Sequence, residues 1–258
     1  MTIKVGVLGA KGRMGETTVA AINGTTDLEL VSALDIGDDI NQLVSSGAQV
    51  VVDFTHPDSV MNNLDFAINH GMSVVVGTTG FNSEKLATVV GWLDANPGVG
   101  ALIAPNFGLG AVLMMQFAAQ ASKYFESVEI IELHHPNKAD APSGTASRTA
   151  ELITEARQSV NKEEMPDATS SGLEGARGAK VGDVPIHSVR LRGLVAHQEV
   201  VLGDTGETLT IRHDSIDRTG FMPGVLLGIR KVVATPGLTF GLEHFLSLIH
   251  ISEPTRPY

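Results

Sequence analysis

Two hydrophobic patterns alternate over the first part of the chain. Short runs that are apolar at nearly every position recur at 3–8, 28–34, 50–54, 72–76 and 99–104. Between most of them lie stretches with helical spacing, at 13–22, 59–69 and 83–95, whereas 35–47 is polar and is left unassigned. Continuously apolar strands that alternate with helices indicate a parallel sheet covered on both faces. We therefore predict an α/β domain with a doubly wound, Rossmann-type parallel sheet.

The pattern changes after residue 107. We predict helices at 108–125, from 143 and at 220–234, and strands at 128–133, 186–191, 195–202 and 208–213. Because the last three strands follow one another with short glycine turns, antiparallel pairing is favoured. The polar, glycine-rich stretch 157–182 is expected to be a mobile loop. This indicates a second, α+β domain with an open, mostly antiparallel sheet, and a final helix, stopped by Pro236 and Gly237, that returns to the first domain.

A glycine-rich turn joins the first predicted strand to the first helix. Its glycines, Gly9, Gly12 and Gly15, form a G-x-x-G-x-x-G variant of the dinucleotide fingerprint. Glycine lets the backbone N–H groups approach a pyrophosphate, and the helix N-terminus adds partial positive charge. Asp35 ends the second strand, where an acidic side chain can bind ribose hydroxyls and disfavours a 2′-phosphate. Lys11 and Arg13 could offset that repulsion, so the choice between NADH and NADPH stays open.

Two further turns follow the fourth and fifth strands. They contain Gly77-Thr78-Thr79-Gly80 and Ala104-Pro105-Asn106-Phe107. Open α/β sheets bind ligands at the carboxyl ends of their strands, and both turns lie at that edge. We therefore expect them to contact the nicotinamide and its ribose.

The densest cluster of reactive side chains lies between residues 129 and 146. His134 and His135 leave a strand, Lys138 follows, and Ser143-Gly144-Thr145 opens a helix. Imidazole titrates near working pH and can act as an acid or a base, while a helix N-terminus with hydroxyl groups suits a carboxylate. Adjacent histidines on a strand point to opposite faces, which argues against a metal site. The cluster is suited to binding a small anion and moving a proton.

Composition narrows the class of partner. The net charge of −11 argues against nucleic acid, although a locally basic site can still take an anionic substrate. There are no cysteines, which fits a reducing compartment. No apolar run is long enough to span a bilayer and the N-terminus has no signal-peptide layout, so we expect no membrane partner and a cytoplasmic protein.

The segment 129–146 resembles the signature of the dihydrodipicolinate reductase family of lysine and diaminopimelate biosynthesis. The glycine turn, the two further turns and the strand region 187–199 resemble the same family in the same order, up to about Phe245. Asp35 and the compact 157–182 region look more like its shorter actinobacterial members. The resemblance implies reduction of 4-hydroxy-tetrahydrodipicolinate to tetrahydrodipicolinate with NADH or NADPH, in a homotetramer assembled through the second domain's sheet, with domain closure around the ligands.

The resemblance also implies roles for individual residues. His134 would be the proton donor or acceptor and Lys138 a second proton donor. The substrate, a small dicarboxylate, would be held by His135, Ser143, Gly144 and Thr145. The cofactor would be held by Gly9, Ala10, Lys11, Gly12, Arg13, Met14, Asp35, Gly77, Thr78, Thr79, Ala104, Pro105, Asn106 and Phe107. No metal is implied.

These patterns suggest a division of the chain. Residues 1–106 with 216–245 would form the dinucleotide-binding domain, and 107–215 the substrate-binding and oligomerisation domain. The remainder, 246–258, reads like an in-frame translation of a sequencing-library adapter, so we interpret it as an extraneous tail.

Two other functions remain to be distinguished. One is a different two-domain dehydrogenase, for example one acting on an amino-acid semialdehyde, which substrate profiling would reveal. The other is a nicotinamide-binding redox sensor without catalysis, which a turnover assay would reveal. The His134-His135 pair followed by Lys138 argues against both.

Overall fold

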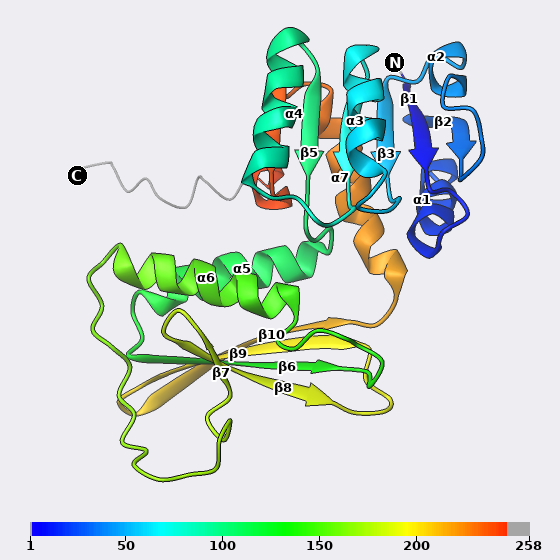
Figure 1. The fold of residues 1–258 in the computed structure, drawn as a ribbon. Coiled ribbons are helices and arrows are strands. Elements are labelled where there is room, and N and C mark those ends of the chain that lie inside the picture. The colour runs from blue at the N-terminus through cyan, green and yellow to red at the C-terminus, as the bar shows by residue number, and fades with distance from the viewer. Residues whose placement is uncertain (1, 247–258) are drawn as a thin grey trace, which may run out of the picture. The chain divides into compact units, whose positions relative to one another are not determined.

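The computed structural model describes residues 2–246, which form two compact units. The first unit comprises the chain up to Phe107 together with the described residues from Phe221 on, and the second is Gly108–Gly220 (Figure 1). The helix α7 (Met222–Val232) therefore belongs to the first unit although it follows the second in sequence. The predicted tail, apart from residue 246, lies outside the described residues.

The first unit is built on a six-stranded sheet in which every pair of neighbours is parallel, in the order β11-β5-β4-β3-β1-β2. The strands are β1 (Ile3–Leu8), β2 (Leu28–Leu34), β3 (Val50–Asp53), β4 (Ser73–Val76), β5 (Gly100–Ile103) and β11 (Gly237–Phe240). The chain proceeds from β1 outward to β2 and then returns to β3 on the other side of β1. This reversal is the switch point at which such sheets bind ligands.

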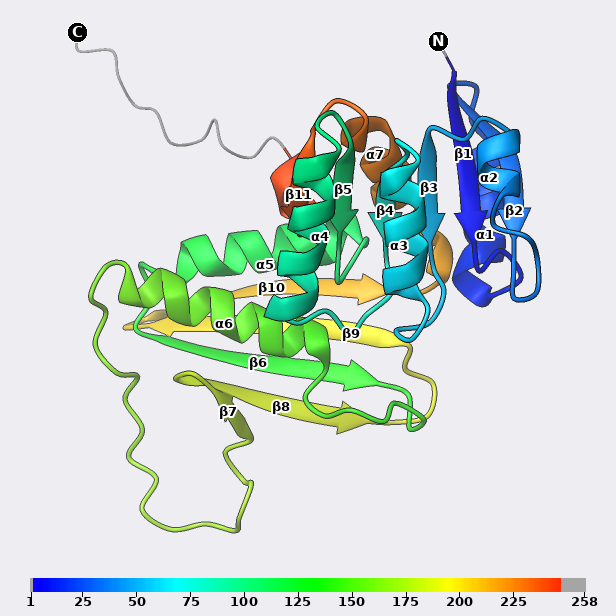
Figure 2. The same ribbon diagram turned by 45° about the horizontal axis from the view of Figure 1, so that its top comes forward.

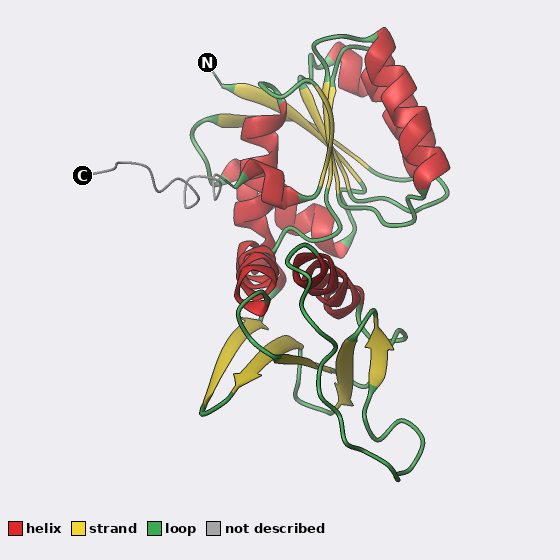
Figure 3. Cartoon of the chain, turned by 90° about the vertical axis from the view of Figure 1, so that its left-hand side faces the viewer, coloured by secondary structure: helices red, strands yellow, loops and turns green. Residues whose placement is uncertain are grey.

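Helices cover both faces of this sheet (Figure 3). They are α1 (Arg13–Asn23), the single turn α2 (Gln42–Ser45), α3 (Val60–Asn69), α4 (Ser83–Ala95) and α7. Short 3₁₀ turns lie at Arg218–Phe221, directly before α7, and at Leu242–Phe245, after β11. Helices α1 and α7 contact each other, as do α3 and α4. Since every residue of β3, β4 and β5 is buried, these strands read as continuous apolar runs, and the doubly wound prediction is confirmed.

Strand β11 was not expected. The sequence pattern assigns Pro236 and Gly237 only as stop signals for the final helix, yet a four-residue strand starts at Gly237 and pairs with β5. Four residues are too few to show a hydrophobic periodicity, so this strand is recognised only from its pairing with β5.

The second unit is a five-stranded sheet with two helices on one face (Figure 2). The strands are β6 (Ser127–His134), β7 (Ala179–Val181), β8 (Val184–Arg190), β9 (Ala196–Asp204) and β10 (Glu207–Ser215), and the helices are α5 (Leu109–Ser122) and α6 (Gly144–Gln158). The order is β10-β9-β6-β8-β7. Every second residue of β6 is buried beneath the helices, while the other face of the sheet carries none of the described helices.

The pairing of β8 differs from the expectation. All neighbours in this sheet are antiparallel except β6 and β8, which are parallel, and β8 and β9 are not neighbours because β6 lies between them. The sheet is therefore mostly antiparallel as predicted, but only β9 and β10 form the expected hairpin. The glycine at 193 lies in a connection between separated strands, which local sequence does not distinguish from a tight hairpin turn.

The loop predicted at 157–182 is shorter in the structure. Arg157 still belongs to α6, and residues 179–181 form β7, so the stretch without helix or strand is 159–178. The Arg157 side chain is buried and donates hydrogen bonds of 3.0 Å to the carbonyl oxygens of Phe125, Glu126 and Glu163. The guanidinium thereby links the end of α6 to residues 125–126, just before β6, and to residue 163 in the loop.

Across the described residues, no helix is both long enough and apolar enough to cross a membrane.

Candidate active site

The glycine turn after β1 has the close packing that its sequence predicts. Gly9 has φ +76°, in the left-handed region, and a Cβ at Gly15 would lie 2.0 Å from the carbonyl oxygen of Gly9. The first turn of α1 therefore approaches the β1 turn more closely than any side chain would allow. Since the first N–H groups of a helix lack partners within the helix, this turn presents donors for a phosphate.

Asp35 is tied directly to this turn. Its carboxylate accepts hydrogen bonds from the backbone N–H of Ile36 at 2.8 Å and of Lys11 at 2.7 Å. These two donors lower the pKa of Asp35 from its usual range, so the side chain is an anion at neutral pH. A carboxylate has about four acceptor sites, so two N–H donors leave capacity for ribose hydroxyls.

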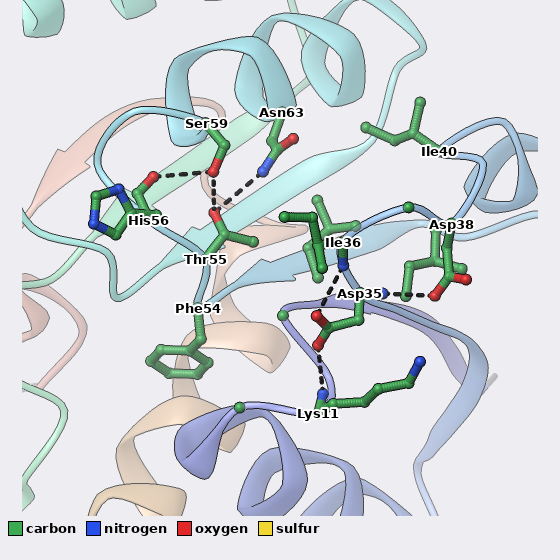
Figure 4. A pocket seen from close by; sticks show the side chains of 15 residues that line it. Lys11, Asp35, Ile36, Asp38, Ile40, Phe54, Thr55, His56, Ser59 and Asn63 are labelled. Atoms are coloured by element: carbon green, nitrogen blue, oxygen red, sulfur yellow. Dashed lines mark hydrogen bonds between the residues drawn. The ribbon is translucent and has the colours of Figure 1, made fainter.

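A cleft of about 590 Å³ lies at the switch point of the sheet. Figure 4 shows Asp35 and Lys11 on one side of this cleft and Thr55, Ser59 and Asn63 on the other. The predicted residues that line it are Gly9, Lys11, Gly12 and Asp35. Lining residues that the sequence reasoning did not identify are Leu8, Leu34, Ile36, Gly37, Asp38, Ile40, Phe54, Thr55, His56, Ser59 and Asn63.

The buried carboxylate of Asp53 connects the loops that follow β3 and β4. It accepts hydrogen bonds from the hydroxyls of Thr55 and Thr78, at 2.7 and 2.8 Å, and from the Asn63 amide at 2.7 Å. Thr78 is one of the predicted cofactor residues, and this contact fixes its side chain. Asp53 ends the run Val50-Val51-Val52, and an acidic residue at the end of a buried strand is the sequence signal that could have revealed it.

The three predicted turns of the first unit meet around Phe54. Its ring packs edge-on against Phe107, with centroids 5.9 Å apart. A Cβ at Gly77 would lie 2.1 Å from the Phe54 ring, so the turn after β4 requires glycine there. These contacts place Gly77, Thr78 and Phe107 beside each other at the carboxyl edge. Thr79 and Pro105 are exposed at that edge, Asn106 is half-buried and Ala104 is buried.

In the second unit, the histidine cluster is organised by a residue that sequence reasoning did not assign. Glu132 is fully buried on β6 and receives both arms of the Arg190 guanidinium at 2.8 Å. Burial alone would raise the pKa of Glu132, but the hydrogen bonds from Arg190, Ser188 and His134 outweigh it and hold the pKa below its usual range. In sequence, Glu132 follows Val128 and Ile130 at the next alternate position, where another apolar side chain is expected, and this charge at an inward position is the signal that could have identified it.

His134 lies against this carboxylate. Its Nδ1 is 2.5 Å from Glu132 Oε2, and only 13% of its side chain is exposed. Burial lowers the pKa of His134, Glu132 opposes that shift, and the positive charges of Lys138 and Arg190 lower the pKa further. His134 is therefore held mainly as a neutral imidazole at pH 7.

Lys138 and the start of α6 already hold a carboxylate in this structure. Asp140 lies 2.7 Å from Lys138 Nζ and accepts a further hydrogen bond from the backbone N–H of Gly144. The pKa of Asp140 lies below its usual value, chiefly because of the hydrogen bond from Lys138, and the Gly144 N–H lowers it further. The lysine and the helix N-terminus can thus hold one carboxylate group together. A Cβ at Gly144 would have no atom within 4 Å, so this helix start is open.

The remaining predicted substrate residues have different surroundings. Ser143 is buried and caps α6, its hydroxyl accepting from the Ala146 N–H at 3.2 Å, while its own N–H donates to Glu132 at 3.2 Å. This leaves the hydroxyl proton of Ser143, and not its N–H, for a ligand. Thr145 is half-buried in the first turn of the helix. His135 is exposed, and its carbonyl accepts from the Lys138 N–H at 3.2 Å.

Comparison with known proteins gives the same assignment over almost the whole chain. The family descriptions "Dihydrodipicolinate reductase, N-terminus" and "Dihydrodipicolinate reductase, C-terminus" match residues 3–107 and 110–246. The chain belongs to the dihydrodipicolinate reductase family. The family and its nucleotide-binding domain imply a small substrate and a pyridine nucleotide cofactor.

Relatives with high sequence identity carry the name 4-hydroxy-tetrahydrodipicolinate reductase. One from Streptomyces coelicolor is 62% identical over 246 residues, covering 95% of this chain and 98% of its own. Another from Nocardia farcinica is 62% identical over 248 residues, covering 96% and 100%. A solved structure, the dipicolinate-bound dihydrodipicolinate reductase from Paenisporosarcina sp. TG-14, has a TM-score of 0.86 and 39% identity, covering 95% of this chain and all of its own.

More distant solved structures share only the fold. The apo scyllo-inositol dehydrogenase from Lactobacillus casei has a TM-score of 0.61 at 12% identity, covering 95% of this chain and 92% of its own. At that identity the likeness shows a common two-domain architecture and carries no inference about the substrate.

Proposed function

We propose that this chain reduces 4-hydroxy-tetrahydrodipicolinate to tetrahydrodipicolinate with a hydride from NADH or NADPH, as a step in lysine and diaminopimelate biosynthesis. The observation that carries the proposal is the grouping of His134, Lys138 and the open start of α6 in a chain that belongs to this reductase family. An acid, a cation and a set of N–H donors are the groups that reduction of a dicarboxylate imine requires.

The first unit fits a dinucleotide on structural grounds. The glycine turn brings the backbone so close that a Cβ at Gly9 would lie 2.7 Å from the carbonyl oxygen of Phe54. The cleft beside it lies at the switch point and has the anionic Asp35 in its wall. In the proposal, residues 9–14 hold the pyrophosphate, Asp35 holds the ribose of the adenosine half, and the turns 77–79 and 104–107 hold the nicotinamide half.

When bound, the nicotinamide supplies the hydride. The 4-hydroxyl group leaves as water to give a conjugated cyclic imine, the hydride adds to this imine, and a proton on the adjacent carbon completes the reduction. The protein's part is to hold the substrate and to provide that proton. Lys138 and the Gly144 N–H bind one substrate carboxylate, taking over the contacts that Asp140 makes in this structure, and Thr145 lies in the same first helical turn. His134 donates in its protonated form, the imidazolium, and the proton leaves from Nε2, because Nδ1 faces Glu132 and keeps its own proton. Lys138 also stabilises negative charge that develops on the substrate.

The proposed preference between the two cofactors follows from charge. The anionic Asp35 disfavours a 2′-phosphate, while the charge of Lys11, which acts on Asp35, and that of Arg13 in the same glycine turn reduce the repulsion. NADH is therefore the expected better cofactor, with NADPH accepted.

The test is a coupled assay. The substrate is generated in place by a synthase that condenses pyruvate with aspartate semialdehyde, and nucleotide oxidation is followed at 340 nm. We expect oxidation that depends on the synthase with both nucleotides and has the lower KM for NADH. A folded, cofactor-binding protein that oxidises neither nucleotide would contradict the proposed reaction.

A further inference from the structure

The position of Glu132 is unusual for a carboxylate. It lies on the helix-facing side of β6 and is fully buried, where an unpaired charge would cost several kcal/mol. The structure compensates with directed partners: the Arg190 fork, the Ser143 N–H at 3.2 Å and His134 Nδ1 at 2.5 Å. The carboxylate is therefore held from several sides and has a defined orientation towards the imidazole.

These contacts determine which ring nitrogen of His134 carries the proton. With two guanidinium N–H groups and a backbone N–H donating to it, Glu132 is ionised, and an ionised carboxylate can only accept. The short contact to His134 must then be a hydrogen bond donated by Nδ1–H. In the neutral ring this leaves Nε2 without a proton, directed away from Glu132.

We propose that Glu132, clamped by Arg190, is the positioning residue that fixes the ring orientation and tautomer of His134, so that Nε2 is the atom that exchanges the proton with the substrate. The inference rests on the proposed function and deepens it. Glu132 and Arg190 would act on the reaction only through His134. Arg190 also donates to the carbonyl oxygen of Asp140 at 2.7 Å, which ties the loop carrying Lys138 to the same carboxylate.

Two substitutions should move the pH profile in opposite directions. The charged groups that act on His134 are Glu132 on its own strand, Arg190 on the neighbouring strand β8 and Lys138 in the following loop. Glu132 raises the pKa of His134, whereas Arg190 and Lys138 lower it. A general acid works in its protonated form, so the rate falls as pH rises through the pKa of His134.

The experiment measures kcat and kcat/KM against pH for the wild-type protein, Glu132→Gln and Arg190→Gln. For Glu132→Gln we expect the basic limb to move to lower pH by about one pH unit, and kcat to fall by about tenfold or more with the KM for NADH unchanged. For Arg190→Gln we expect the limb to move to higher pH. Limbs that stay in place, or move in the same direction, would overturn the proposal.

Glu129→Gln is a matched control. Glu129 lies on the opposite face of β6 and makes a similar contact, 2.7 Å from its carboxylate to His187 Nε2. It also pairs with Arg177. Losing this carboxylate should leave the limb where it is in the wild-type protein. A shift equal to that of Glu132→Gln would mean that the profile reports general charge and not the positioning of His134.

A second measurement needs neither turnover nor a variant at Glu132. In the wild-type protein labelled with ¹⁵N-histidine, with the His134 signal assigned by its loss in His134→Gln, the neutral ring should carry its proton on Nδ1. A proton on Nε2 would overturn the proposal even if the enzyme is active. If the protein lacks the proposed reductase activity but shows Nδ1–H, then the proposed function fails while Glu132 is still shown to orient the ring.

Discussion

At the scale of single residues, buried carboxylates organise the candidate site in each unit. Asp53 holds Thr55, Thr78 and Asn63, and Glu132 holds Arg190 and His134. A buried carboxylate is tolerated when donors surround it, and the same donors fix its orientation. The side chains around the two carboxylates are thereby held in defined positions.

Lys138 should serve the substrate and not the cofactor. In Lys138→Ala the anchor for one carboxylate is lost, so we expect the KM for substrate to rise and kcat to fall, each by about tenfold or more. Calorimetric titration with NADH should give the wild-type affinity. A loss of NADH affinity in this variant would place Lys138 in a different site.

At the scale of elements, what could be predicted depends on how local the determinants are. The glycine turn was predicted because Gly9, Gly12 and Gly15 lie within one strand–turn–helix segment. Glu132 was not assigned, because the Arg190 that neutralises it lies 58 residues further along the chain. The pairing of β6 with β8 likewise joins strands that are far apart in sequence, so local pattern does not predict it. Local pattern thus predicts most of the elements, but not the short α2, β7 and β11, and not which strands are neighbours.

A pair of glycine substitutions in helices tests the close approach in the turn. In Gly15→Ala the added Cβ would lie 2.0 Å from the Gly9 carbonyl oxygen, so α1 must move away from the turn. We expect NADH affinity to fall at least about tenfold and the free energy of unfolding to fall by about 1–3 kcal/mol.

The matched control for that substitution is Gly91→Ala on α4, where a Cβ would have no atom within 4 Å. Alanine is favoured over glycine inside a helix by roughly 0.5–1 kcal/mol, so this variant should have an equal or higher Tm and normal NADH affinity. Thermal unfolding and NADH titration of both variants check the expectation. Normal cofactor binding by Gly15→Ala would show that the turn tolerates a wider spacing.

At the scale of the whole molecule, net charge and local charge differ. The chain carries a net charge of −11, yet Lys138 and Arg190 lie together beside His134. Net charge therefore argues against nucleic acid, but it does not describe the candidate site, where the proposed anionic substrate would meet fixed cations.

The second unit's sheet has one face that no described helix covers, and this face bears on the oligomeric state. On the face of the second sheet away from α5 and α6, Ile131, Leu133, Val189 and Val201 are only half-buried. We propose that a homotetramer forms through this face, so light scattering should give four times the chain mass of 27.1 kDa. Ile131→Lys should give smaller species, whereas Val90→Lys, at a 40% exposed position on α4, should not. A monomeric wild-type protein would contradict this assembly.

The coupled assay with the wild-type protein and His134→Ala side by side tests the proposed reaction and its proton donor together. We expect synthase-dependent oxidation of NADH by the wild-type protein, and a kcat lower by about a hundredfold or more in His134→Ala, with unchanged NADH affinity. An unchanged kcat in His134→Ala would contradict the role given to this histidine, and no oxidation by the wild-type protein would contradict the reaction itself.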